Sequence, residues 1–172
     1  MYRNYNNCCR PMNNCCNNRF MRGPRGATGP TGPRGAPGGS ILADFINGAT
    51  GEVEVDDLIP FSNNNNLSNG NITSTNGTNI VTLVNPGTYR VTYNANATSS
   101  GEGGLVGITA TLNGGDITQS ISEETPVGTD GVVNLGNSFL ITTGPNATLS
   151  LVNSGENPTT YTNLNLIIEK IT

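Results

Sequence analysis

Four cysteines are the residues of this sequence best suited to chemistry. They form two adjacent pairs in a Cys-Cys-x5-Cys-Cys arrangement, at Cys8, Cys9, Cys15 and Cys16. Structural zinc sites use spaced cysteines, so that two sulfurs converge on one ion, and adjacent cysteines do this poorly. Adjacent cysteines also rarely pair with each other. The pattern therefore favours disulfides to another chain over a zinc site, and a disordered tail with free thiols is the remaining alternative.

Elsewhere in the chain few residues are suited to catalysis. Histidine is absent from the 172 residues, so no Ser-His or Cys-His pair can activate a nucleophile. We expect no enzyme, no catalytic residue and no cofactor. An acidic cluster at Glu52, Glu54, Asp56 and Asp57 could bind calcium if it were repeated around an axis, but a solvated strand edge and loop is the favoured interpretation. We therefore predict no metal site.

Charge divides the chain into two unlike parts. Residues 1–39 hold six of the eight basic residues and no acid, whereas the rest carries two bases against twelve acids. The acidic, aromatic-poor part does not suit nucleic-acid binding, and no apolar run is long enough to span a membrane. The opposite charges favour a head-to-tail contact between copies, which is open and generates filaments. Phe20 and Met21, or Tyr2 and Tyr5, are the candidate apolar anchors of the basic arm at 1–22.

Glycine recurs at every third position of a short segment that follows the arm. The repeat comprises Gly23, Gly26, Gly29, Gly32, Gly35 and Gly38, with prolines at several of the intervening positions. Three polyproline-type chains meet at an axis that has room only for glycine, so this register predicts a collagen triple helix over 23–40 and an assembly of three chains. A flexible Gly/Pro linker would keep the composition but not the register. Because six triplets are few, we expect a trimeric head to clamp the stem.

The head, residues 41–172, alternates short apolar runs with Gly, Asn and Pro. Period two is clearest in 88–97, where Tyr89, Val91, Tyr93, Ala95 and Ala97 share one face. The sequence Asn113-Gly114-Gly115 favours a hairpin turn, and no segment has helical periodicity. We predict an all-β sandwich, with a jelly roll as the favoured kind. Outward positions rich in Asn, Thr and Ser suit packing against copies of the same domain. The predicted strands are 41–46, 52–55, 58–61, 79–84, 88–97, 105–112, 116–121, 131–142, 147–153 and 161–171.

From about residue 23 onward the sequence resembles the collagen-like glycoproteins that coat bacterial spores. The glycine triplets carry this resemblance, together with VNPGTYRVTYNANA at 84–97, GITATLNG at 107–114 and LIIEK at 166–170. A further shared feature is Ile59-Pro60-Phe61 after a strand. The resemblance implies a homotrimeric C1q/TNF-like jelly roll behind a short collagen stem. It also implies O-glycosylation of Thr28 and Thr31.

The cysteine-bearing arm departs from that family and is similar to the N-terminal connectors of spore appendage fibres. We therefore expect a structural subunit of a spore-surface fibre, in the exosporium or an endospore appendage. Its trimers would stack through the arm, and disulfides would lock them after mother-cell lysis. The absence of a standard secretory signal agrees with synthesis in the mother cell. The expected partners are further copies and other spore-coat or exosporium proteins, without nucleic acid or membrane. An adhesin with a ligand-binding C1q-like head, or a phage tail-fibre segment, is the alternative.

Overall fold

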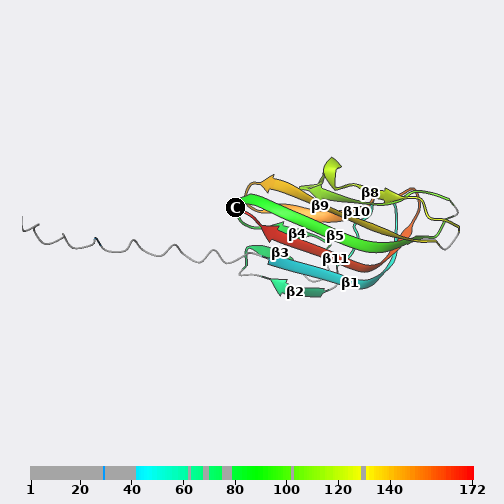
Figure 1. Ribbon diagram of the computed structural model, residues 1–172, viewed down its shortest axis with the longest axis horizontal. Coiled ribbons are helices and arrows are strands. Elements are labelled where there is room, and N and C mark those ends of the chain that lie inside the picture. The colour runs from blue at the N-terminus through cyan, green and yellow to red at the C-terminus, as the bar shows by residue number, and fades with distance from the viewer. Residues whose placement is uncertain are drawn as a thin grey trace, which may run out of the picture. The chain divides into compact units, whose positions relative to one another are not determined.

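The described part of the chain is built from two antiparallel sheets that pack face to face (Figure 1). The computed structural model describes Gly29 and residues 42–61, 63–67, 70–74, 79–101, 103–128 and 131–172. Sheet A has the order β2 (Asn63–Leu67), β1 (Leu42–Val53), β11 (Thr159–Lys170), β5 (Gly87–Ser99) and β9 (Val132–Thr143). Sheet B has the order β3 (Ile72–Ser74), β4 (Val81–Leu83), β10 (Ala147–Asn153), β6 (Val106–Leu112) and β7 (Gly115–Asp116), and β8 (Ser122–Glu124) also pairs with β6. The prediction of an all-β sandwich is confirmed.

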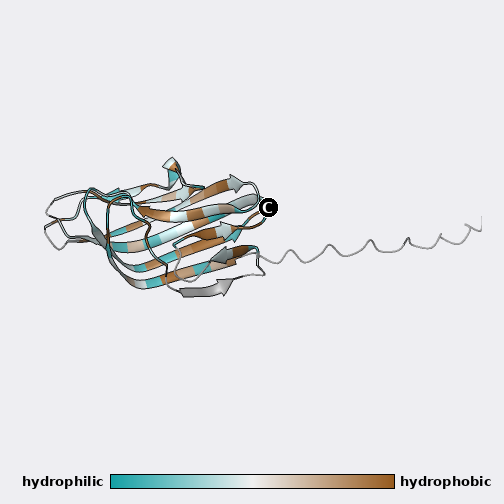
Figure 2. Ribbon diagram, turned by 180° about the vertical axis from the view of Figure 1, so that it is seen from behind, coloured by the Kyte–Doolittle hydropathy of each residue, from teal (hydrophilic) through white to brown (hydrophobic). Residues whose placement is uncertain are grey.

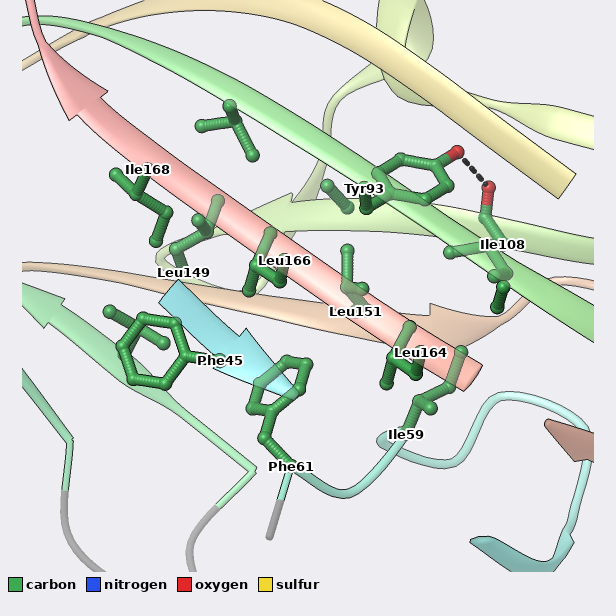
Figure 3. Close-up of a cluster of buried hydrophobic side chains, with 14 of the residues drawn as sticks. Phe45, Ile59, Phe61, Tyr93, Ile108, Leu149, Leu151, Leu164, Leu166 and Ile168 are labelled. Carbon is green, nitrogen blue, oxygen red and sulfur yellow. Dashed lines mark hydrogen bonds between the residues drawn. The ribbon is translucent and has the colours of Figure 1, made fainter. Parts of the chain in front are cut away.

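Alternation of apolar and polar residues along the strands places the core between the sheets (Figure 2). The five residues predicted to share one face of β5, from Tyr89 to Ala97, are all buried. Figure 3 shows how side chains from both sheets meet, with Phe45 and Leu166 from sheet A close to Leu149 and Leu151 from sheet B. The core is thus shared by strands that are far apart in the sequence.

Strand β1 is continuous, although turn-forming residues at 47–51 predicted a break between two strands. A register shift between Ala49 and Glu52 absorbs the irregularity as a bulge in the pairing with β11. Two buried polar side chains complete the hydrogen bonding around it. The Asn47 Nδ2 donates to the Pro60 carbonyl at 2.8 Å, and the Thr50 Oγ1 accepts from the Tyr161 amide at 2.9 Å. Tertiary hydrogen bonds therefore override the local turn preference.

Other boundaries also differ from the prediction. The segment 58–61 is not a strand and makes only an isolated bridge between Leu58 and Val152. The predicted strand 116–121 instead contains the end of β7 and a 3-10 helix, η1 (Thr118–Ser120). Strands β2 and β3 were not predicted, because neither has the apolar alternation that marked the others; β2 reads NNNNL and forms through pairing with β1.

The hairpin predicted from Asn113-Gly114-Gly115 is confirmed. Leu112 pairs with Gly115, so Asn113 and Gly114 form a two-residue turn between β6 and β7. Both turn residues have positive φ, 52° and 81°, which Asn and Gly adopt at least cost. The Asn113 Oδ1 accepts a hydrogen bond from the Thr148 amide at 2.9 Å, which fastens the turn to β10.

Candidate self-association surface

The outward side of sheet A is uncharged across three neighbouring strands, β11, β5 and the edge strand β9. The strand registers align its residues in four rows, so that Asn165, Asn94 and Gly136 lie side by side, as do Ile167, Thr92 and Ser138. We call these twelve positions the sheet A face. They are Thr160, Thr162, Asn165, Ile167, Thr92, Asn94, Asn96, Thr98, Val132, Asn134, Gly136 and Ser138.

Polar groups on the sheet A face bond to each other across the strands. Thr92 and Ser138 share a hydrogen bond of 2.8 Å between their hydroxyls, and the Asn134 Nδ2 donates to the Asn96 Oδ1 at 3.0 Å. Side chains that are already paired lose little hydrogen bonding when a second molecule covers them. These two pairs can therefore be buried at a modest desolvation cost, whereas the Asn165 Oδ1 on the same face is buried without a hydrogen-bond partner among the described residues.

Charged side chains border the sheet A face instead of entering it. At one end Arg90 and Glu169 form an ion pair at 3.2 Å, and their half-exposed side chains limit its contribution to about 1 kcal/mol or less. Asp44 and Glu52 lie along the flank, on the outward positions of β1 that pair with β11. The charges thus border the uncharged surface at one end and along the β1 side.

Exposed apolar residues mark the β9 side of the same surface. Val132 is 65% exposed within the sheet A face, and Leu140, opposite Arg90 at its end, is 53% exposed. The sequence predicted strand 131–142, but not the exposure of these two side chains, because their neighbours across the sheet come from distant β5. Single exposed apolar residues are ordinary on monomers. Here one lies within the uncharged sheet A face and the other at its end, and this combination suits an interface.

Most residues that the sequence singled out lie outside the described residues. These are all four cysteines, Thr28, Thr31 and five of the six stem glycines: Cys8, Cys9, Cys15, Cys16, Gly23, Gly26, Gly32, Gly35 and Gly38. Gly29 is described and exposed, and a Cβ at that position would meet no atom within 4 Å. The interchain disulfides, the stem and the glycosylation sites stay predictions.

The acidic residues considered for calcium do not converge. Glu52 lies on β1 in sheet A, whereas the Asp56 amide donates to the Asn153 carbonyl on β10 of sheet B at 2.9 Å. Among the residues that the structure describes, no three Asp, Glu, Cys or His side chains gather into a metal-binding group. The cluster in the sequence is thus divided between the two sheets.

Shifted pKa values in the described part belong to tyrosines of the core and not to the sheet A face. Burial raises the pKa of Tyr93 and Tyr161 well above the ordinary value of a phenol, and it raises that of Tyr89 as well. These side chains stay neutral and donate hydrogen bonds inside the sandwich. The three tyrosines thus contribute to the stability of the fold.

In the described part of the chain, the three residues of η1 are the only helical ones, and no helix there is long and apolar enough to cross a membrane.

Comparison with known proteins identifies the fold. No family model matches the sequence, and no curated protein matches it either. Among solved structures, the Eiger TNF of S. frugiperda aligns with a TM-score of 0.59 and 15% identity over 77% of this chain and 93% of that one. The globular domain of zebrafish complement 1qA gives 0.58 and 13% over 78% and 98%, and murine APRIL gives 0.59 and 7% over 77% and 100%. The predicted C1q/TNF-like jelly roll is therefore confirmed as the fold of the head.

Proposed function

We propose that this chain is a structural subunit of a bacterial spore-surface fibre or appendage, whose head associates as a homotrimer. The sheet A face is the observation that carries the self-association, because it is uncharged, has hydrogen bonds between side chains of neighbouring strands, contains exposed Val132 and has exposed Leu140 at its end. The triplet repeat supports the number of subunits, since a collagen helix takes three chains. The C1q/TNF-like fold and the resemblance to spore-surface glycoproteins support the same assembly. The role is mechanical and requires no catalysis.

Trimers extend into a fibre, in this proposal, through the basic arm at 1–22. The arm carries positive charge and four cysteines, and the head carries ten more acids than bases. Attraction between an arm and the head of another trimer gives an open contact, which repeats without closing. Disulfides among Cys8, Cys9, Cys15 and Cys16 then lock the assembled fibre once the surroundings become oxidising.

The trimer is tested by placing one charge at the centre of the sheet A face. Asn94 is exposed on the central strand β5, in one of the two inner rows of the sheet A face. Asn94→Lys should therefore bring three ammonium groups into the interfaces and convert the trimer to monomers, as measured by light scattering after gel filtration. Thr73→Lys, exposed on the outward side of β3 in sheet B, is the matched control and should leave the trimer intact. A monomeric parent protein, or a trimeric Asn94→Lys variant, would contradict the proposed interface.

The fibre is tested separately by electron microscopy of the full-length protein with and without reductant. We expect fibres whose SDS-resistant multimers disperse in reductant, and expect replacement of the four cysteines by serine to abolish that resistance. Deleting residues 1–22 should stop polymerisation while leaving trimers. An undiminished fibre after this deletion would remove the arm from the mechanism, and an adhesin head that kept its ligand without forming fibres would favour the alternative function.

A further inference from the structure

A trough crosses the outward side of sheet B, on the opposite side of the sandwich from the sheet A face. It has a volume of about 380 Å³, and its floor is made by Thr111 and Ser150, which are cross-strand partners on β6 and β10. Their side chains are 6% and 7% exposed, and their hydroxyls are hydrogen-bonded at 2.7 Å. Because these two side chains are small, they form the bottom of the trough. The loop with Asp56 and Leu58 and the β6–β7 hairpin with Gly114 and Asp116 form its sides.

Each end of the trough carries a carboxylate. Asp116, on β7, is the cross-strand partner of Thr111, whereas Asp56 belongs to the loop whose Leu58 bridges to Val152 on the far side of β10. From β7 across β6 and β10 to this loop there are three strand spacings of about 4.8 Å. Because the Asp56 amide bonds to the Asn153 carbonyl, three residues along β10 from Ser150, the two aspartate backbones are also displaced by about 10 Å along the strands and lie roughly 17 Å apart. Leu58, Ile80 and Val152 form the apolar wall of the trough.

The head itself supplies no cation for these two carboxylates. Arg90 and Lys170 are the only basic residues in 41–172. Arg90 is paired with Glu169, and the Lys170 Nζ lies 6.0 Å from the centre of the Tyr89 ring, so both are engaged on sheet A. A trough with an acid at each end, an apolar wall and no basic neighbour selects a ligand that carries two positive charges separated by apolar groups.

The arm of this same chain contains that pattern as Arg19-Phe20-Met21-Arg22. We propose that Arg19–Arg22 of another copy binds in the sheet B trough, with the guanidinium groups at Asp56 and Asp116 and the two apolar residues over the wall. In an extended segment, three residue steps cover about 10 Å, and the long arginine side chains supply the remaining reach. Each guanidinium can bind a carboxylate through two parallel hydrogen bonds. The inference rests on the proposed function and names the site at which one trimer receives the next.

The binding test separates the trough from the rest of the assembly. The receptor is the full-length chain carrying Arg19→Gln and Arg22→Gln, so that its own arms do not compete, and it is kept in reductant. The probe is a fluorescent peptide of residues 15–26 with serine in place of Cys15 and Cys16, and binding is followed by anisotropy. We expect saturable binding that weakens about tenfold when Asp56→Asn and Asp116→Asn are introduced together, since two exposed ion pairs are lost.

The matched control removes the same number of charges outside the trough. Glu123→Gln with Glu124→Gln should change the affinity less than twofold, because both carboxylates are exposed on β8 and neither lines the trough. Probe variants test the other partner without any risk to the fold of the receptor. Replacing both probe arginines by glutamine should abolish binding, and replacing Phe20 and Met21 by serine should weaken it.

Several results would overturn the trough proposal. These are equal affinity for the trough variant and the parent receptor, an equal loss in the control, or indifference of the probe to its arginines. Displacement of the probe by a neutral monosaccharide such as methyl glucoside would assign the trough to carbohydrate instead. Light scattering on the same receptor reports the trimer independently. A monomeric receptor that still binds the probe contradicts the proposed function, whereas a trimer without probe binding contradicts only this inference.

Discussion

Two tyrosines of sheet A tie the sandwich together by donating hydrogen bonds into sheet B. The Tyr93 hydroxyl donates to the Ile108 carbonyl at 3.1 Å, and the Tyr161 hydroxyl donates to the Gly107 carbonyl at 2.8 Å and contacts the Asn153 Oδ1 at 2.9 Å. Both rings are almost completely buried. Each side chain therefore adds a large apolar surface to the core and a polar link between the sheets.

Removing the Tyr161 hydroxyl tests this link. Tyr161→Phe keeps the ring but loses the hydrogen bonds to sheet B, so the free energy of unfolding should fall by about 1 to 2 kcal/mol. Urea denaturation followed by circular dichroism measures the change. Tyr89→Phe is the control, because the Tyr89 hydroxyl donates to the Asn85 carbonyl in the loop just before β5, and losing this local hydrogen bond should cost less. Equal stabilities of Tyr161→Phe and the parent would show that the link between the sheets contributes nothing.

The same tyrosines predict how stability depends on pH. Burial raises the folded-state pKa of Tyr89, Tyr93 and Tyr161 above 10, so above pH 10 the unfolded chain loses phenolic protons that the folded chain keeps. Their contribution is thus complete below pH 10 and falls as pH rises, by up to about 1.4 kcal/mol per pH unit for each tyrosine. Urea unfolding between pH 9 and 12 should give this slope. Tyr93→Phe with Tyr161→Phe should flatten it, and an unchanged slope would contradict the assignment.

Sequence alternation predicted which β5 residues are buried, but not where the tyrosine hydroxyls bond. A period of two requires only local information, and it placed Tyr89, Tyr93 and their neighbours on one face. The acceptors of Tyr93 and Tyr161 are backbone carbonyls of β6, the Ser120 carbonyl of η1 and a side chain of β10, and the packing of the sheets brings them into reach. The same limit applies to the trough, because only the strand order of sheet B places Asp56 and Asp116 at its two ends.

At the scale of elements, the strands with strong alternation were predicted well and the polar ones were not. Strand β10 matches its predicted bounds 147–153, and β5 extends the predicted 88–97 at both ends. Strand β2 consists of four asparagines and a leucine, so its existence depends on the free edge of β1 that it pairs with. The sheet A face could likewise be predicted only in part. The sequence of β5 showed that its outward side is polar, but the residues of β11 and β9 that lie beside it are known only from the strand registers.

The start of β5 depends on a glycine for a steric reason. Gly87 has a φ of +155°, and a Cβ there would lie 2.1 Å from the Thr172 carbonyl oxygen and 2.6 Å from the Lys170 Cε. Gly87→Ala must therefore displace the C-terminal residues that bond to Thr88, and we expect a loss of about 1 to 3 kcal/mol in unfolding free energy. Gly48→Ala, where a Cβ meets no atom within 4 Å, should change stability much less. Comparable urea midpoints for the two variants would contradict this account.

At the scale of the whole molecule, the two outward sides of the head differ in the kind of contact that they offer. The sheet A face is uncharged and broad, whereas the sheet B trough is narrow and acidic at both ends. Contacts through an uncharged face depend on apolar burial and paired hydrogen bonds, which salt hardly screens. Contacts between arginines and exposed carboxylates depend on attraction that salt weakens strongly. The trimer, held by the sheet A face, should therefore be insensitive to salt, whereas the contact between trimers at the trough should be sensitive to it.

Raising the salt concentration should therefore separate fibres into trimers without separating trimers into monomers. In reductant, where no disulfide holds the subunits, 1 M NaCl shortens the screening length to about 3 Å and should dissociate the arm from the trough. Light scattering should then report fibres at low salt and the trimer mass, not the monomer mass, at high salt, and electron microscopy should show fibres only at low salt. Without reductant, fibres assembled beforehand should survive the same salt, because covalent bonds between arms no longer depend on charge. Fibres that resist salt in reductant would show that the arm is held by apolar contacts, with Phe20 and Met21 in place of the arginines as its principal anchors.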